Sequence, residues 1–281
     1  MYISVGDIDI FVEVVGTRLG IRDGQVFEKP TVILLHGGPS LDHLAMRPDF
    51  EALAEHAQLI FYDHRGLGRS GKSHPGTWNL QTWARDLHVL VRTLGLGRPI
   101  ILGQSFGGFV AQKYALDYPD DLGGLVLLST AARIDLDHVV DNFTRAGGAR
   151  IGELARAFFT AQSPEARDRF LEEGLPFYTV GRKKIGLLSQ FEPAVMDHFF
   201  ADESHSFDYR QALATVTVPT LVIGGDSDPA TSATAARELG SCFAPGVAQT
   251  VILEQCGHGP MRDQPGKTLQ VLSDYLEKVG I

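Results

Sequence analysis

The 281-residue sequence contains few cysteines and little positive charge. Its two cysteines, Cys242 and Cys256, are too few for a disulfide scaffold and show no CxxC or Cys/His spacing typical of a metal site. Asp and Glu outnumber Lys and Arg by 34 to 25, and this net charge of −9 repels phosphate backbones and anionic membrane surfaces. The densest positive run, residues 181–184, is too short to reverse that balance locally. We therefore expect no metal, no cofactor and no nucleic-acid partner.

Long apolar segments are also missing. No stretch approaches the roughly 20 apolar residues that a membrane helix needs. The N-terminal residues alternate as strands do, without the basic start and apolar run of a signal peptide. These absences predict a cytoplasmic protein with no membrane contact, and the sequence leaves the oligomeric state open.

Short β-branched and aliphatic runs alternate with helical stretches along most of the chain. Such runs, typical of strands buried on both faces, occupy residues 31–36, 58–63, 99–104, 125–130, 220–225 and 249–254. Helices are predicted over residues 47–57, 78–94, 106–118, 231–240 and 264–279. Residues 2–16 are predicted to form a strand pair, and residues 17–29 a polar connection. The alternation predicts an α/β fold with a doubly wound, mostly parallel sheet.

Residues 131–210 interrupt this alternation. They contain no convincing strand, but several helical stretches, the clearest of which cover residues 148–161, 163–174 and 192–203. We predict that residues 1–130 and 211–281 form the core, and that residues 131–210 form a helical cap over the carboxyl edge of the sheet.

The segment Gly103–Gly107 fits the pattern G-x-S-x-G and lies directly between a predicted buried strand and a predicted helix. In that context the serine occupies a sharp, strained turn, and its neighbours two positions away must be very small. The turn raises the hydroxyl above the sheet edge, at the N-terminus of a helix. Ser105 is therefore the candidate nucleophile.

A serine needs a base, and the base needs a carboxylate that orients it. His258 follows the last predicted strand and is the only histidine C-terminal to the carboxylates Asp226 and Asp228, which follow the preceding strand. Both loops lie at the carboxyl ends of parallel strands, where open α/β sheets place their ligand sites. The spacing favours Asp228 as the acid and leaves Asp226 as the alternative. The unused aspartate is expected to cap the following turn or helix.

An oxyanion that forms on the substrate needs N–H donors. The backbone N–H of Phe106, directly after the nucleophile, is one candidate. The second is the N–H of Gly38, because the loop His36–Ser40 follows the first buried strand and its glycines let the backbone approach a tetrahedral intermediate.

With these pieces in place, the chain resembles the α/β-hydrolase superfamily and, within it, the proline iminopeptidase-like branch. The resemblance is carried by HGGP (36–39), YDHRGLGRS (62–70), GQSFGG (103–108), GGDSDP (224–229) and CGHGP (256–260). The family's G-x-x-D pattern implies Asp228 as the acid. Its D-x-R-G-x-G-x-S pattern implies that residues 63–70 support the site without doing chemistry.

The resemblance implies a serine hydrolase that cleaves an ester or amide bond of a small substrate through an acyl-enzyme. The chain departs from the peptidase pattern, because Trp78 and Trp83 both lie in the core and Ser40 and Phe106 replace an expected glycine and tryptophan. The alternatives are a carboxylesterase or lactonase with a hydrophobic acyl substrate, and a catalytically weak ligand receptor of the same fold. The expected partner is a small ester, lactone, amide or short peptide.

Two groups of cap residues bear on that choice. The cap carboxylates that could hold a substrate amine, most of them expected on solvated helical faces, are Glu165, Glu172, Glu173, Glu192, Asp202 and Glu203. Aromatic residues that could line an apolar pocket above Ser105 are Phe143, Phe158, Phe159, Phe170, Phe177, Tyr178, Phe191, Phe199 and Phe200.

Overall fold

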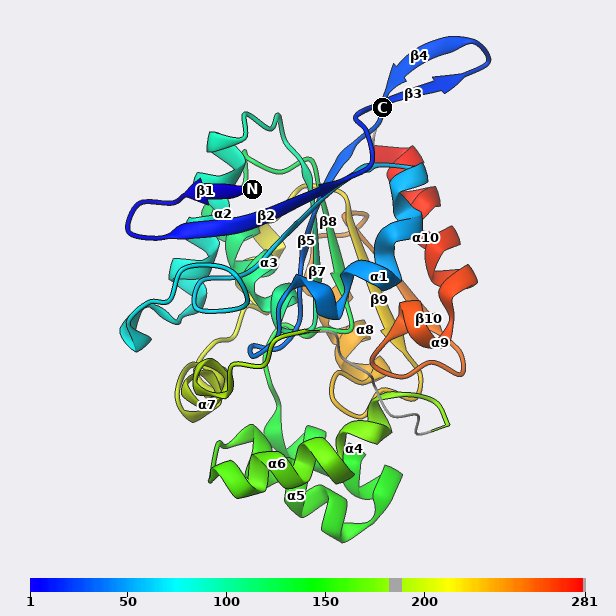
Figure 1. The fold of residues 1–281 in the computed structure, drawn as a ribbon. Coiled ribbons are helices and arrows are strands. Elements are labelled where there is room, and N and C mark those ends of the chain that lie inside the picture. The colour runs from blue at the N-terminus through cyan, green and yellow to red at the C-terminus, as the bar shows by residue number, and fades with distance from the viewer. Residues whose placement is uncertain (182–188, 280–281) are drawn as a thin grey trace.

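The computed structural model describes residues 1–181 and 189–279, so residues 182–184 of the positive run lie outside the described part. Its main element is an 8-stranded sheet in the order β1-β2-β6-β5-β7-β8-β9-β10 (Figure 1). The strands are β1 (Tyr2–Ser4), β2 (Asp9–Val15), β5 (Thr31–Leu35), β6 (Gln58–Tyr62), β7 (Ile100–Gln104), β8 (Gly124–Leu128), β9 (Thr220–Gly225) and β10 (Ala248–Leu253). β1 pairs antiparallel with β2 and β2 antiparallel with β6, whereas the pairings from β6 to β10 are parallel. The mostly parallel sheet is confirmed.

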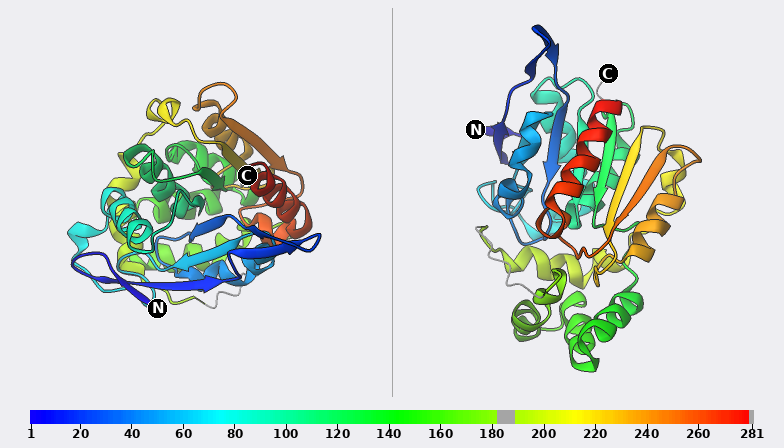
Figure 2. Two further views of the ribbon diagram at one scale, coloured as in Figure 1. Left: turned by 90° about the horizontal axis from the view of Figure 1, so that it is seen from above. Right: turned by 90° about the vertical axis from the view of Figure 1, so that its right-hand side faces the viewer.

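Helices cover both faces of this sheet (Figure 2). One face carries α2 (Leu80–Thr93), α3 (Phe106–Asp117) and α8 (Ala233–Ser241). The other carries η1 (His43–Ala45), α1 (Arg47–Phe50), η2 (Glu51–Glu55), α9 (Pro260–Asp263) and α10 (Pro265–Val279). Along β5, Val32 and Leu34 pack toward α10, whereas Ile33 and Leu35 pack toward α2 and α3. Because successive side chains face opposite sides of a strand, both helical layers require apolar residues, which explains the unbroken β-branched runs.

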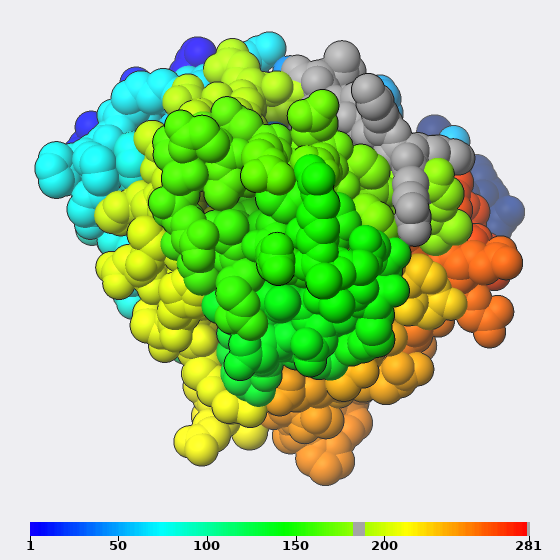
Figure 3. All heavy atoms as spheres, turned by 90° about the horizontal axis from the view of Figure 1, so that it is seen from below, coloured from blue at the N-terminus to red at the C-terminus, as the bar shows by residue number. Residues whose placement is uncertain are grey.

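In the described part of the chain, four α-helices follow β8 and precede β9: α4 (Leu136–Gly147), α5 (Ala149–Phe159), α6 (Pro164–Glu173) and α7 (Pro193–Ala201). They lie beyond the carboxyl ends of the parallel strands (Figure 1), and from that side atoms of α4 to α6 cover the centre of the molecule (Figure 3). The side chain of Ser163 accepts a hydrogen bond from the N–H of Ala166 and Pro164 occupies the first turn, so α6 begins where the sequence predicted. Among the described residues, no helix is both long and apolar enough to cross a bilayer.

Short 3-10 turns connect the longer elements. They are η3 (Pro75–Thr77), η4 (Leu175–Tyr178), η5 (Glu203–His205) and η6 (Ala212–Thr215). The helix predicted over residues 47–57 is instead the four-residue α1 followed by the 3-10 helix η2. Its buried residues Phe50 and Leu53 are three positions apart, a spacing that the 3-10 period satisfies as well as the α-helical period does.

The polar connection predicted over residues 17–29 is wrong in one respect. It contains a hairpin, β3 (Leu19–Arg22) and β4 (Gln25–Glu28), which projects at the end of the molecule opposite α4 to α6 (Figure 1). The side chains of Leu19, Ile21 and Val26 are exposed, so the hairpin buries no apolar face against the core. The signal that the prediction overlooked is the dipeptide Asp23-Gly24, which forms the two-residue turn with both residues at positive φ.

Candidate active site

Ser105 lies in the turn between β7 and α3, with φ 54° and ψ −118°. A Cβ atom at Gly103 would collide with the carbonyl oxygen of Gly107, and one at Gly107 would collide with that of Leu35. The strained backbone is held because the N–H of Ser105 donates to the carbonyl of Leu128 at 2.9 Å. The spacing of the two glycines is therefore a steric requirement of this turn.

The structure brings Ser105, His258 and Asp228 together from loops that follow three parallel strands, β7, β10 and β9. Nε2 of His258 lies 2.9 Å from Oγ of Ser105, and Nδ1 lies 2.8 Å from Oδ2 of Asp228. The Asp228 carboxylate is fully buried and the His258 ring is nearly so. These distances form a continuous path from hydroxyl to imidazole to carboxylate.

The surroundings of Asp228 determine which nitrogen of His258 carries the proton. Its Oδ1 accepts hydrogen bonds from the N–H groups of Ala230 (2.8 Å) and Thr231 (3.0 Å), and its Oδ2 accepts one from the Thr231 hydroxyl (2.7 Å). Burial alone would raise the pKa of Asp228, but the charge of His258 and the hydrogen bonds outweigh burial and lower this pKa below 3.8. An ionised Asp228 accepts a hydrogen bond from the N–H at Nδ1 of His258, which leaves Nε2 unprotonated and able to accept from the hydroxyl of Ser105.

Thr231 is a site residue that the sequence pattern did not identify. Its hydroxyl also lies 3.2 Å from Nδ1 of His258, so it contacts both the imidazole and the carboxylate of Asp228. A threonine three residues after an aspartate in a turn is the available signal, because such side chains often close the turn.

Asp226, the alternative acid, faces a different partner. Its carboxylate accepts hydrogen bonds from the N–H groups of Gln255 (3.1 Å) and Cys256 (3.2 Å), in the loop that leads to His258. The expectation that the unused aspartate caps the following turn is wrong, since Asp228 itself accepts the N–H groups of that turn. Asp226 instead joins the two loops that follow β9 and β10.

The two candidate oxyanion donors lie beside Ser105. Phe106 is the first residue of α3, so its N–H has no carbonyl one turn earlier to bind. Gly38 lines the same cavity as Ser105, and a Cβ atom built on its neighbour Gly37 would lie 3.4 Å from Cβ of Ser105. Within residues 1–181 and 189–279, no protein hydrogen bond engages the N–H of Gly38.

His36 holds the loop that contains Gly38. Burial of its ring lowers the pKa of His36, so the imidazole is neutral. Its Nδ1 donates to the carbonyl of Gly37 at 2.8 Å, and its Nε2 accepts from the N–H of His64 at 3.2 Å. The loop after β5 is thus fixed to the loop after β6.

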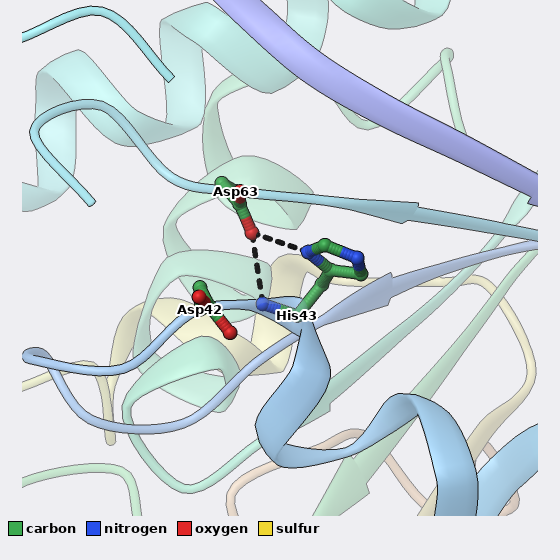
Figure 4. Close-up of side chains that lie close together, drawn as sticks. All are labelled: Asp42, His43 and Asp63. Atoms are coloured by element: carbon green, nitrogen blue, oxygen red, sulfur yellow. Dashed lines mark hydrogen bonds and ion pairs between the residues drawn. The ribbon is translucent and has the colours of Figure 1, made fainter. Parts of the chain in front are cut away.

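A second cluster, Asp42, His43 and Asp63, lies under the same loop (Figure 4). Its potential ligand atoms lie within 4.8 Å of one another, close enough to surround a cation. Oδ1 of Asp63 accepts from N (2.8 Å) and Nδ1 (2.7 Å) of His43. Asp42 accepts from the N–H groups of Leu44 (2.9 Å) and Gln190 (3.0 Å). These hydrogen bonds account for the burial of the cluster and tie the loop after β5 to the segment before α7.

Hydrogen bonds of buried side chains also hold residues 63–70, the segment with the D-x-R-G-x-G-x-S pattern. The buried guanidinium of Arg65 donates to Asp86 at 2.7 Å and to Asp7 at 2.8 Å. The hydroxyl of Ser70 donates to the carbonyl of Asp63 at 2.6 Å. None of these groups touches Ser105 or its partners, so the segment supports the site from below.

A cavity of about 400 Å³ lies over Ser105 and His258. All of the predicted cap aromatics except Phe143 and Phe177 line it. The ring of Tyr178 lies 4.5 Å from the ring of His258, so one of these aromatics covers the imidazole directly. Size and lining are those of a pocket for a small, mostly apolar ligand.

Two carboxylates line this cavity among the described residues, Asp135 and Glu238. Each is paired with an arginine: Asp135 with Arg133 at 2.7 Å, and Glu238 with Arg210 at 3.3 Å. None of the six cap carboxylates considered from the sequence lines the cavity in this part of the chain. One of them, Glu203, instead accepts a hydrogen bond from the N–H of Leu80 in the core.

Comparisons with known proteins agree with this architecture. A family model described as alpha/beta hydrolase fold matches residues 30–265. The chain is 29% identical to a proline iminopeptidase of Lactobacillus helveticus, over 91% of this chain and 92% of that protein. A thermophilic esterase from Thermogutta terrifontis superimposes with a TM-score of 0.69 at 27% identity, over 97% of this chain and 94% of the esterase. A proline iminopeptidase from Mycobacterium smegmatis, at 18% identity, shares the fold with a TM-score of 0.72, over 99% of this chain and 97% of that one.

Proposed function

Because the chain belongs to the α/β-hydrolase fold family, and specifically to its proline iminopeptidase-like branch, we propose that this hydrolase cleaves small carboxylic esters or amides with Ser105 as nucleophile. In this proposal His258 is the general base, Asp228 orients it, and the N–H groups of Phe106 and Gly38 bind the oxyanion. Residues 1–130 and 211–281 form the catalytic core, and residues 131–210 are the cap that encloses the substrate.

The reaction follows from the hydrogen-bond path. Oγ of Ser105 attacks the carbonyl carbon of the substrate while Nε2 of His258 takes the hydroxyl proton. The carbonyl oxygen becomes an oxyanion that the N–H groups of Phe106 and Gly38 stabilise. His258 gives its proton to the leaving group, and an acyl-enzyme remains. A water molecule then attacks the carbonyl carbon of the acyl-enzyme while His258 takes its proton. His258 returns this proton to Oγ of Ser105 as the bond to the acyl group breaks, which releases the acid and restores the free serine.

The observation that carries the proposal is the separation of 2.9 Å between Oγ of Ser105 and Nε2 of His258, at the strained turn and beneath an apolar cavity. Loops that contribute to one reaction must keep this geometry to a fraction of an ångström. The buried hydrogen bonds around Asp228 supply that rigidity.

The cavity favours an ester or lactone with an apolar acyl group over a substrate with a free amine. An ammonium group buried beside aromatic rings needs an unpaired carboxylate to replace its hydration. Both carboxylates that line the cavity in the described residues, Asp135 and Glu238, already have arginine partners. An apolar acyl chain has no such requirement and gains from contact with the aromatic wall.

Aminopeptidase activity is the second candidate, and the proline iminopeptidase relatives favour it. For this activity the substrate amine would have to bind Asp135 or Glu238 beside its arginine partner or displace that arginine.

A substrate panel separates the two candidates. It comprises p-nitrophenyl acetate, butyrate and octanoate, aliphatic lactones of graded length, and prolyl and alanyl naphthylamides. We expect kcat/KM for the butyrate ester to exceed that for prolyl naphthylamide by at least about 100-fold. The reverse ratio would favour the aminopeptidase. Saturable binding of these compounds without any turnover would indicate a receptor of the same fold.

A further inference from the structure

The loop Gln255–His258, between β10 and α9, is held through its backbone. All four of its N–H groups donate hydrogen bonds in the structure. The first two bind Asp226, which belongs to the core loop after β9. Because these bonds stay within the core, they fix the start of the loop independently of the cap.

The last two N–H groups behave differently. The N–H of Gly257 donates to Oδ2 of Asp263 at 2.8 Å, and the N–H of His258 donates to the carbonyl of Tyr178 at 2.7 Å. The same Oδ2 of Asp263 also accepts from the N–H of Val180 at 3.1 Å. One carboxylate oxygen therefore joins the residue before the imidazole to the cap segment that follows η4.

Steric contact strengthens this link. A Cβ atom at Gly257 would collide with the carbonyl oxygen of Tyr178, so the backbone of the cap is pressed against the loop. The ring of Tyr178 also packs on the ring of His258. The position of the imidazole consequently depends on where residues 178–180 lie.

We propose that Asp263 is a positioning residue for His258, and that it couples the general base to the cap; this rests on the proposed function. Asp263 touches neither the substrate cavity nor the reacting atoms. Its carboxylate binds the N–H of Gly257, the residue before His258, and also the N–H of Val180. A shift of Val180 therefore moves the backbone of Gly257 as well. A substrate that shifts residues 178–180 of the cap therefore changes the orientation of the His258 imidazole as well as the shape of the pocket.

The first test removes and then restores the acceptor. Asp263→Ala is expected to lower kcat for p-nitrophenyl butyrate by about 10- to 100-fold while KM changes less than about 3-fold, because misplacing a catalytic group affects the chemical step. Asp263→Asn keeps an amide oxygen that can accept both N–H groups, so it should retain at least about one third of kcat. Both variants are neutral at this position, so a difference between them reports the acceptor rather than the charge. Equal kcat values for D263A and the native protein would overturn the proposal.

The second test removes only the link to the cap. Val180→Pro deletes the N–H that binds Asp263, and the preceding residue already has φ −120° and ψ 147°, which proline tolerates in its neighbour. We expect V180P to lower kcat by about 5-fold. The matched control Val180→Ala keeps the N–H and should remain within about 2-fold of the native protein, since only the side chain changes. Equal kcat for V180P and V180A would exclude coupling through Asp263.

These results are distinguishable from failure of the proposed function. If the native protein hydrolyses no ester and is not labelled by a fluorophosphonate, the proposed function fails before any variant is made. If the native protein is active, the variants decide the role of Asp263 alone. Melting curves and fluorophosphonate titration of active sites ensure that kcat refers to folded protein, so V180P provides the test if D263A does not fold.

Discussion

The floor and the roof of the cavity differ in the contacts that hold them. In the floor, hydrogen bonds of 2.7–3.0 Å hold the backbone of Ser105 to Leu128, the carboxylate of Asp228 to its own loop and to His258, and the backbone of His258 to Tyr178. In the roof, aromatic rings pack on one another, and Phe158 stacks on Phe170 with ring centroids 4.2 Å apart. Hydrogen bonds specify direction and distance, whereas apolar packing specifies mainly volume. We therefore expect changes in the floor, and in the backbone link from Val180 to it, to alter kcat, and changes in the aromatic rings of the roof to alter substrate choice.

The largest expected effect comes from removing the proposed nucleophile, Ser105, in the floor. Ser105→Ala should lower kcat/KM for p-nitrophenyl butyrate by at least about 10⁴-fold, because hydrolysis then lacks the covalent step. The melting temperature of S105A should not fall, because alanine removes a polar hydroxyl from the wall of an apolar cavity. A variant that keeps more than a tenth of the native activity would place the nucleophile elsewhere.

Asp226 and Asp228 lie in the same loop of the floor, so replacing each by asparagine compares their two roles directly. Asp228→Asn should lower kcat by about 10⁴-fold, because an amide no longer holds the Nδ1–H tautomer of His258. Asp226→Asn should cost only about 10-fold, since it weakens bonds to the loop and leaves the imidazole with its partner. Steady-state kinetics on both variants test this order, and a larger loss for D226N would make Asp226 the acid.

In the roof, a truncation should change preference more than rate. Phe158→Ala removes a ring that lines the cavity, so it should raise the octanoate-to-acetate ratio of kcat/KM about 10-fold. The value of kcat for acetate should stay within about 3-fold. The lost ring contacts should also destabilise the fold by about 3 kcal/mol, measured by denaturant unfolding. Phe158→Leu, which keeps an apolar side chain of intermediate volume, serves as the control, and a uniform loss of kcat with all esters would contradict the division between floor and roof.

The smallest expected effect is a pH dependence of stability that comes from His43, beneath the floor. Burial disfavours the charged form of His43, but the hydrogen bond to Asp63 and the nearby carboxylates outweigh burial and raise its pKa above 6.5. A raised pKa means that protonated His43 stabilises the fold fully at low pH, and that this stabilisation is lost as pH rises through the folded-state pKa. His43→Gln should therefore lower the melting temperature more at about pH 5.5 than at about pH 8.5. An equal decrease at both pH values would show that the charge of His43 is not involved.

The sequence signals of the floor are short patterns. The two glycines flanking Ser105 lie within five consecutive residues, although Gly107 is required by its close approach to the distant Leu35, and buried strands are recognised by unbroken apolar runs. The spacing favoured Asp228, and the structure brings its carboxylate to His258. What the sequence did not predict depends on distant partners: Asp226 binds residues 29 and 30 positions away, and Asp263 reaches Val180 across 83 positions.

The roof was predictable in kind but not in detail. An aromatic-rich helical segment indicated an apolar pocket. Only the packing of the helices reveals that Phe143 and Phe177 do not line this pocket, whereas the other predicted rings do. Most carboxylates of the cap were expected to be solvated, but the sequence did not indicate that Glu203 is half-buried and binds the core. Which face of a short helix turns inward depends on the surface it meets, and a single sequence does not describe that surface.

Mapping the site of covalent labelling tests the account most directly. The native protein is treated with a fluorophosphonate, its intact mass is measured, and the modified peptide is sequenced. A single adduct on residue 105, formed at a rate that falls sharply in His258→Ala, is the predicted result. An adduct on any other residue, or rapid ester hydrolysis that leaves residue 105 unmodified, would contradict it.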